Sequence, residues 1–274
     1  HDIYQVKNKL DNKRLQFDLK DIELPDNFKD DLASKPPVQA QFRDEDQGKP
    51  LKEFTTMDWK YYIAYYNYLV EFLDHQLGKL IDKLQETEQF ENTLIIFTSD
   101  HGDLRGFHRT PFKGPMMYDE LIKVPLIFTW KGIIPKNESR SQLTSNIDLF
   151  PTICDLINIE IPENLDGESL NRCINSQEFK SKRDFIIAEY YSKQKWINPI
   201  RTIINDRYKY NLYLSGSEEL YDLKEDKVEV NNLIDSEKYK KVKENLKSKL
   251  LNWIKEENDP FFDFKRTKRD GDYV

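Results

Sequence analysis

The sequence predicts an α/β fold, and three segments carry that prediction. The short run Leu94–Phe97 is uninterrupted, apolar and rich in β-branched and aromatic residues, as in a strand buried on both faces of a parallel sheet. A second run of this kind, Val124–Trp130, returns after a loop. Between residues 57 and 86 the apolar side chains recur mostly every three or four positions, which predicts a long helix that covers the sheet.

Shorter elements complete the predicted order. They are a helical turn over Met116–Ile122, a helix over Asn146–Leu156, strands over Phe185–Tyr190, Ile200–Asn205 and Tyr208–Leu214, and an amphipathic helix over Glu237–Glu256. The three strands indicate a small antiparallel sheet. Asn146 or Asp148 would cap the middle helix, with Pro151 in its first turn. Residues 27–56 are polar and interrupted by proline and glycine, so we expect a surface loop that either borders a site or is only solvated.

Composition excludes several classes of function. The chain has 274 residues, a formal net charge of −7 and 33% charged residues, and its mean hydropathy is −0.78. The acidic balance argues against a nucleic-acid partner, and no apolar run is long enough to cross a membrane.

Cys154 and Cys173 form no Cys-x-x-Cys pair. We expect two reduced thiols, in a cytoplasmic protein of bacterial character.

Two candidate metal ligands follow the first predicted strand. Asp100 and His101 come directly after the apolar run, and in α/β sheets ligands bind beyond the carboxyl ends of strands. A carboxylate oxygen beside an imidazole nitrogen can hold a divalent cation, and Gly102 lets the backbone turn without a Cβ clash. The alternative is a plain loop in which Asp100 caps the next helix.

The residues around this pair form an ordered series of motifs. Ser99-Asp-His-Gly-Asp103 is followed by Lys113-Gly-Pro115, Tyr118-Asp-Glu120 and Val124-Pro-Leu126. This order and spacing resemble the sulfatases of the alkaline phosphatase superfamily. The resemblance implies an alkaline-phosphatase-like α/β/α sandwich, present in part, with a small C-terminal antiparallel sheet plus a helix.

The resemblance also implies roles for individual residues. Asp100 and His101 would bind a divalent metal, calcium being favoured over manganese and magnesium, and Lys113 would contact the sulfate of a small sulfated substrate. His108 would also bind the substrate, from the loop before Lys113. The family often has an acidic residue immediately before this histidine, where the chain has Phe107, so the contacts of this loop are open.

Two further segments extend the resemblance. His1-Asp-Ile-Tyr4 is similar to a Pro-His-x-Pro-Tyr segment of sulfatases, although it lacks the two prolines. The resemblance implies that His1 protonates the leaving oxygen. The alternative is that His1 belongs to a frayed terminus. Leu165–Leu170 resembles the turn that closes the main domain. We therefore expect the C-terminal part of the α/β domain in residues 1–170 and a small α+β subdomain in residues 171–274.

The nucleophile of a sulfatase is missing. The family uses Cys or Ser in Cys-x-Pro-Ser-Arg, and neither Cys154 nor Cys173 has that context. We therefore expect the C-terminal half of a longer sulfatase, inactive alone, whose partners are the N-terminal half and, as an open possibility, further copies of the chain. The alternatives are a phosphonate monoester or phosphodiester hydrolase and a non-catalytic sulfate-binding remnant. Sulfated sugar, choline sulfate and aryl sulfate are all open as substrates.

Overall fold

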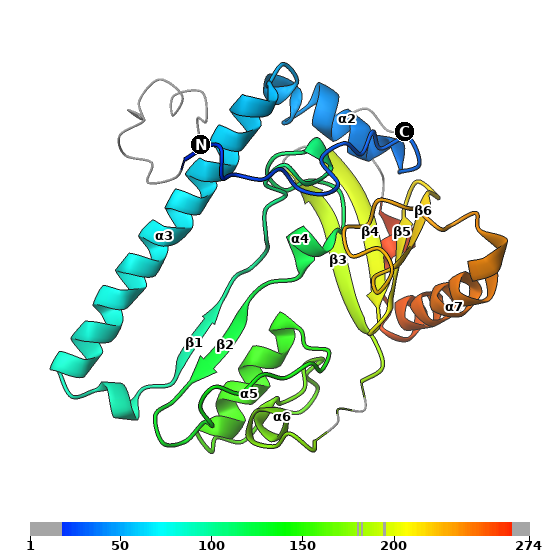
Figure 1. Cartoon of the computed structure of the whole chain (residues 1–274). Helices are drawn as coiled ribbons and strands as arrows, with labels where there is room; N and C mark the ends of the chain where they lie inside the picture. Colours follow the sequence, from blue (N-terminus) through cyan, green and yellow to red (C-terminus); the bar gives the residue numbers. More distant parts are fainter. Residues whose placement is uncertain (1–17, 180, 182, 194–195, 265–274) are drawn as a thin grey trace.

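The computed structural model describes residues 18–179, 181, 183–193 and 196–264. The described residues form two antiparallel sheets (Figure 1). In the first, β1 (Ile95–Thr98) pairs with β2 (Leu126–Thr129). The second is a meander of β3 (Ile186–Lys193), β4 (Trp196–Ile204), β5 (Tyr208–Tyr213) and β6 (Glu218–Asp222) in that order.

Helices of very different lengths connect and cover these strands. They are α2 (Pro37–Glu45), α3 (Thr56–Glu86), α4 (Asp119–Ile122), α5 (Leu149–Leu156), α6 (Asn171–Asn175) and α7 (Lys240–Glu256). Short 3₁₀ turns flank several of them, including η2 (Phe90–Asn92) after α3 and η4 (Asn146–Asp148) before α5. No helix among the residues just described is both long and apolar enough to cross a lipid bilayer.

The C-terminal sheet is buried on both faces. Tyr210 and Leu212 of β5 pack against Leu250 of α7, which lies along one face of the sheet (Figure 1). Asn211 and Tyr213, which alternate with them, are also buried and point to the opposite face. The predicted strands and the predicted final helix are therefore confirmed, although β6 was not expected.

The opposite face of this sheet packs against the N-terminal part of the chain. Phe42 of α2 and Tyr118 form one cluster with Tyr221 of β6. Met117 forms a second cluster with Ile200 of β4. Hydrophobic contacts thus cross the predicted domain boundary at residue 170, which itself remains a prediction.

The long helix α3 begins and ends close to the expected residues. Its start is fixed by a capping box, in which the Thr55 side chain accepts the Asp58 N–H and the Asp58 carboxylate accepts the Thr55 N–H. Its buried residues, however, lie only in the first turns, from Trp59 to Ala64. Leu73 is 55% exposed. The expectation that the whole helix covers the sheet is therefore wrong for the described residues.

Two further expectations are wrong. Residues 27–56 are not simply a surface loop, because they contain α2, whose Gln39 and Phe42 are buried. Pro37, one of the prolines that interrupt this stretch, occupies the first turn of α2, where its missing N–H costs nothing. β1 was expected in a parallel sheet and fully buried. It pairs antiparallel with β2, and all four of its residues are half-buried.

Candidate functional site

Asp100 lies in an extended loop directly after β1 and does not cap a helix. Its Oδ1 atom accepts the His101 N–H at 2.9 Å, and its Oδ2 atom lies 3.5 Å from His101 Nε2. The side chain is 84% exposed. The bond from the His101 amide lowers the pKa of the Asp100 carboxyl, so the group is a carboxylate at neutral pH. The capping alternative is therefore wrong.

The His101 ring directs the lone pair of Nε2 toward Lys113, beside this carboxylate. Its Nδ1 atom lies 2.8 Å from the Gly102 carbonyl oxygen, which can only accept, so Nδ1 carries the proton. Lys113 Nζ donates to Nε2, which must therefore be the acceptor. This is the tautomer in which Nε2 can bind a metal. The structure thus brings Asp100, His101 and Lys113 together, as the motif order predicts.

The loop after His101 is fixed against α4. The Gly102 N–H donates to the Leu121 carbonyl at 2.8 Å. A Cβ atom on Gly102 would lie 1.8 Å from the Glu120 carbonyl oxygen, a distance that no side chain tolerates. The glycine is therefore required by close packing against α4, and α4 in turn holds the two candidate ligands in place.

His108 lies in the interior, and the substrate contact expected for it does not fit this position. The residue is fully buried, and its ring stacks on Tyr118 with centroids 3.8 Å apart. Nδ1 donates to Asp30 Oδ2 at 2.7 Å, and Nε2 accepts from Asn27 Nδ2 at 2.9 Å. Burial lowers the pKa of His108, so the ring is neutral. These contacts anchor the loop after the candidate ligands to residues 27–30.

Asp148 has a structural environment, as expected for a residue at a helix start. Its carboxylate is fully buried and accepts the Ser145 N–H at 2.8 Å. It also pairs with both terminal nitrogens of Arg183, at 2.6 and 2.8 Å. These bonds leave it no role as a metal ligand.

The chemistry of the Asp100 and His101 donors fits a divalent cation only in part. The described residues contain no group of three or more His, Cys, Asp or Glu side chains that could hold a metal. A hard cation such as calcium is coordinated by six to eight oxygen atoms. Asp100 and His101 alone are therefore too few donors for a calcium site among the described residues. His1 lies outside the described residues, so its predicted role stays a prediction.

Family models match almost the entire described chain. The model described as N-sulphoglucosamine sulphohydrolase, C-terminal, matches residues 106–256, and the model described as Sulfatase matches residues 24–159. The chain belongs to the sulfatase family. The matched regions contain all the motifs from Ser99 to Leu126 on which the resemblance was based.

Individual relatives give the same result. The sulfatase chain is 31% identical over 256 residues to a Δ4,5-hexuronate-2-O-sulfatase of Bacteroides thetaiotaomicron, a match that covers 91% of the chain and 53% of the relative. The solved structure of a 2-O GAG sulfatase superposes with a TM-score of 0.84 at 30% identity, covering 90% of this chain and 54% of that one. The predicted alkaline-phosphatase-like α/β fold is confirmed.

A further structure belongs to a different hydrolase. The phosphonate monoester hydrolase of Agrobacterium radiobacter superposes with a TM-score of 0.67 at 27% identity, covering 81% of the chain and 46% of that protein. In all three comparisons the chain spans about half the length of the protein that it matches.

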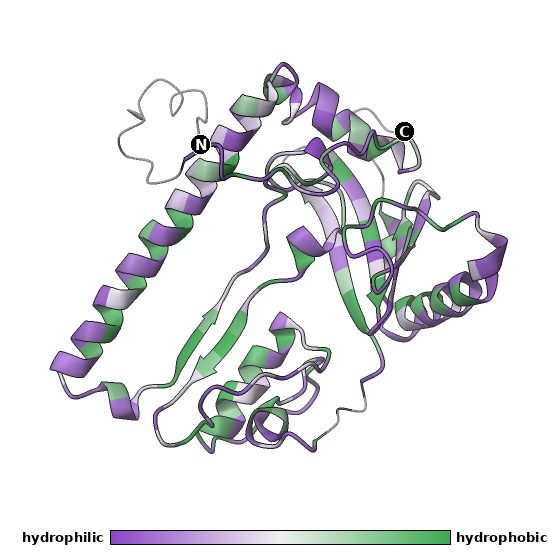
Figure 2. Cartoon of the chain, viewed as in Figure 1, coloured by the Kyte–Doolittle hydropathy of each residue, from purple (hydrophilic) through white to green (hydrophobic). Residues whose placement is uncertain are grey.

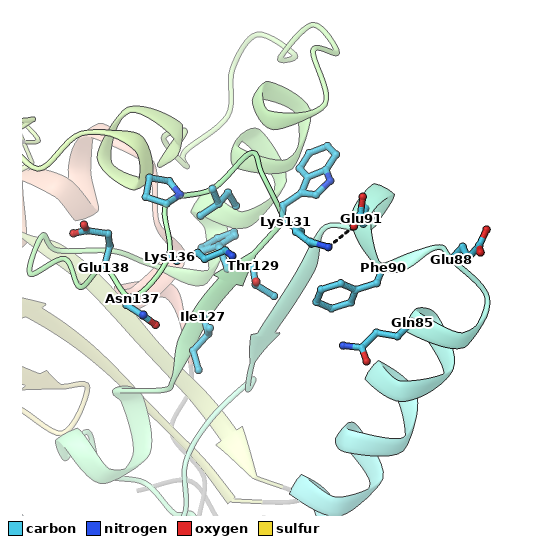
Figure 3. Close-up of a pocket in the computed structure, with 14 residues that line it drawn as sticks. Gln85, Glu88, Phe90, Glu91, Ile127, Thr129, Lys131, Lys136, Asn137 and Glu138 are labelled. Atoms are coloured by element: carbon cyan, nitrogen blue, oxygen red, sulfur yellow. Dashed lines mark hydrogen bonds and ion pairs between the residues drawn. The ribbon is translucent and has the colours of Figure 1, made fainter.

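One large hollow in the described part of the chain lies away from the candidate ligands. It has a volume of about 1110 Å³ and is lined by the end of α3, by η2, and by β2 with the residues after it (Figure 3). Thr129 of β2 lines this hollow and pairs with Ile95, the first residue of β1, whereas Asp100 follows the other end of β1. The hollow therefore does not contain the two candidate metal ligands.

A buried ion cluster binds Asp119, the first residue of α4. The sequence did not reveal this cluster. Lys209 Nζ lies 2.9 Å from Glu229 Oε1 and 2.6 Å from Asp119 Oδ1, and Glu229 Oε2 accepts the Asp119 N–H at 2.7 Å. Lys209 and Glu229 are fully buried. Asp119 belongs to the recognised Tyr-Asp-Glu motif, but no local pattern singles out Glu229, which lies 110 residues further along the chain.

Glu229 should make the stability of this sulfatase depend on pH. Burial raises the pKa of its carboxyl from 4.5 to about 7. The folded state then binds more protons than the unfolded state between these values, so this contribution to stability is present at low pH and falls as the pH rises through that window. We expect Glu229→Gln to remove this decrease. Urea unfolding of both proteins at about pH 5 and about pH 7.5 checks it, and parallel changes in the two proteins would contradict it.

Proposed function

We propose that this chain supplies half of the catalytic site of a metal-dependent sulfatase that hydrolyses sulfate monoesters. The nucleophile and the remaining metal ligands would lie on an N-terminal segment. One observation carries the proposal: Asp100, His101 and Lys113 converge beyond the carboxyl end of β1 in a chain that belongs to the sulfatase family.

The two ligands would be the Asp100 carboxylate and the lone pair on His101 Nε2. Calcium is the favoured cation, with manganese and magnesium as alternatives, since carboxylate oxygens suit all three. When bound, such a cation acts as a Lewis acid toward a sulfate oxygen. The loop that carries both ligands is already ordered by its packing against α4.

Lys113 would bind the sulfate itself. In this structure its ammonium group donates to His101 Nε2, the atom that would coordinate a metal. With Nε2 bound to a metal, the Lys113 ammonium group would need another acceptor, and an anionic sulfate oxygen would provide it. Lys113 would thereby neutralise negative charge on the sulfate. His1 would donate the proton to the departing oxygen, as general acid.

The relatives narrow the substrate classes to be tested first. The similarity to a hexuronate-2-O-sulfatase and to a 2-O GAG sulfatase favours a sulfated sugar over choline sulfate and aryl sulfate. The fold similarity to a phosphonate monoester hydrolase supports a second candidate, the cleavage of phosphonate monoesters. The test uses a protein that contains both halves. Its rates of hydrolysis of a matched aryl sulfate and aryl phosphonate ester distinguish the two functions.

The isolated chain is expected to hydrolyse no sulfate ester, because it lacks the nucleophile motif. The measurement is release of nitrophenol from nitrophenyl sulfate by purified chain, with and without calcium, against a buffer blank. A protein that joins this chain to the N-terminal segment of the Bacteroides relative serves as the positive control. Turnover by the isolated chain would show that the site is complete and would overturn the half-site proposal.

Calcium should bind the isolated chain only weakly. Two protein donors leave a hard cation mostly hydrated, so we expect no saturation at micromolar calcium in a calorimetric titration. Asp100→Asn is the matched variant, since it removes the charge and keeps the shape. Tight one-to-one binding that Asp100→Asn abolishes would mean that the described loop is already a complete site.

A further inference from the structure

A second hollow lies beside the C-terminal end of α2. Its volume is about 570 Å³, which is within the usual range for a site that binds a small ligand. Its lining comes from residues 28–31, from the last turn of α2 and the residues after it, from the first turn of α3, and from the loop that follows the candidate metal ligands. Most of the lining side chains are charged, and Figure 2 shows α2 mostly in the purple of hydrophilic residues. The hollow is therefore a polar one, formed by segments that are far apart in the sequence.

Three cations in this lining are not used by the protein itself. The side chains of Lys29, Lys52 and Arg109 make no hydrogen bond or ion pair with any described residue. Arg43, in contrast, is paired with Asp44 through two bonds of 2.8 and 3.0 Å. The bond from Arg43 lowers the pKa of the Asp44 carboxyl, and the charges of Lys52 and Arg109 act in the same direction, so both lie near Asp44. Positive charge thus exceeds what this carboxylate pairs with.

A buried donor in the same lining also lacks an acceptor. Trp59 is 1% exposed, and its Nε1 atom has no hydrogen-bond partner in the described part of the chain. An indole N–H can only donate, and native proteins rarely leave a buried donor unpaired. The ring is held by edge contacts with Phe28 and Phe54, with centroids 5.6 and 5.9 Å apart. The hollow therefore has a fixed N–H group beside its cations, and this group requires an acceptor.

The loop that carries Arg109 has an unusual backbone. Arg105, His108, Arg109 and Phe112 all have φ between 45° and 60°, in the left-handed region. This region is rare for residues other than glycine, and such residues gather where a protein holds a ligand. The buried His108 anchors the loop from inside, and the next residue, Arg109, is exposed and lines the hollow. The guanidinium group is thus presented on a backbone that is already ordered.

Two carboxylates in the lining can accept further hydrogen bonds. Asp31 uses Oδ1 to accept the Ala33 N–H at 2.8 Å, which leaves Oδ2 available. Glu53 makes no side-chain hydrogen bond with the described residues. Asp30, in contrast, is already engaged by His108 and by a backbone N–H. The hollow thus offers donors for an anionic group together with acceptors for hydroxyl groups.

We infer that this hollow binds a sugar that carries an anionic group, either a sulfate or a carboxylate. Lys52, Arg109 and the Trp59 N–H would hold the anionic group, and Asp31 and Glu53 would accept sugar hydroxyls. A neutral sugar would leave the cations unpaired, and an inorganic anion would leave most of the volume and both acceptors unused. The choice of a sugar rests on the proposed function. The hollow contains neither the two candidate metal ligands nor the lysine assigned to the reacting sulfate, so it is a second binding site.

Proton–nitrogen NMR of the isolated chain tests the inference, because the Trp59 indole N–H gives a signal of its own. The chain is titrated with glucose 6-sulfate, glucuronic acid, glucose and inorganic sulfate at constant ionic strength. We expect at least one acidic sugar to shift the Trp59 signal saturably at millimolar concentration, and glucose and inorganic sulfate to bind about tenfold more weakly, as expected for one charged hydrogen bond. The acid that binds more tightly identifies the anionic group.

Two results of this titration would overturn the inference. One is the absence of a saturable shift with both acids. The other is an equal affinity for inorganic sulfate, which would mean that the hollow recognises only the anion. Trp59→Phe identifies the signal, and if this variant does not fold, the other three indole signals are identified by the phenylalanine variants of Trp130, Trp196 and Trp253.

Matched variants locate the site. Arg109→Ala and Lys52→Ala each remove one exposed cation from the hollow and should weaken binding of the acidic sugar about tenfold. Lys83→Ala removes a lysine that is 69% exposed near the other end of α3, and should leave the affinity unchanged. Unchanged affinity in both Arg109→Ala and Lys52→Ala would overturn the inference.

This test is independent of the proposed catalysis, because the isolated chain contains every residue that lines the hollow. Binding of an acidic sugar here, with no sulfatase activity in the protein that also contains the N-terminal segment, would keep this inference and reject the proposed function. Sulfatase activity of that protein, without saturable binding at the hollow, would reject this inference and keep the proposed function.

Discussion

Lys113→Ala is expected to lower kcat/KM for a sulfate ester by about 10²–10³-fold in a protein that contains both halves of the site. Removing one preorganised charged donor from the position where negative charge develops typically has an effect of this size. Lys113 is placed for that role because its ammonium group already contacts His101 Nε2. Steady-state kinetics on a sulfated sugar, or on nitrophenyl sulfate, measure the loss.

Two variants control for a general loss of charge or fold. Lys227→Ala removes an exposed lysine and should leave kcat/KM within about twofold, as surface changes usually do. Lys113→Arg keeps the charge but changes its shape, and should retain more activity than Lys113→Ala. A change of less than about threefold for Lys113→Ala, with an unchanged unfolding transition, would remove this lysine from the site.

Glu229→Ala should lower the free energy of unfolding by about 3–5 kcal/mol, because it leaves a fully buried ammonium group without its main partner. Lys209 is buried completely and loses two hydrogen bonds in this variant, keeping only the bond to Asp119. The Asp119 N–H also loses its acceptor. Urea unfolding, followed by circular dichroism, gives the difference directly.

The second substitution in the cluster distinguishes an unpaired charge from a simple cavity. Replacing both Glu229 by alanine and Lys209 by methionine should recover part of the lost stability. The double variant no longer contains the unpaired, buried ammonium group of Lys209. Glu225→Ala, an exposed carboxylate nearby, is the control and should change little. A loss below about 1 kcal/mol for Glu229→Ala, or no recovery in the double variant, would contradict this account.

The cluster also connects stability with the candidate site. Glu229 holds the first residue of α4 through the Asp119 amide, and the backbone of α4 holds Gly102. The ligand loop is therefore supported by a contact between segments far apart in the sequence. Such support cannot be seen in the motif itself.

Local patterns in the sequence were sufficient for much of the fold. The period of apolar residues predicted α3, and the strand-like run Tyr208–Leu214 between turn residues predicted β5, because each element is specified by neighbours within a few residues. The grouping of Asp100, His101 and Lys113 was also accessible, since the motifs that carry them are consecutive and lie within fourteen residues of each other. Their chemical roles remain proposals.

Long-range contacts decided the rest. His108 was expected at the substrate, but its partners Asn27 and Asp30 lie 81 and 78 residues away, and they draw the ring into the interior. The antiparallel pairing of β1 depends on which strand is available beside it. The sequence by itself therefore determined most of the helix and strand segments, though not α2 or β6, and the candidate ligands, since these depend on short-range spacing. Only the tertiary structure decided burial, strand pairing and the Glu229 cluster, because each of these depends on which distant segments meet.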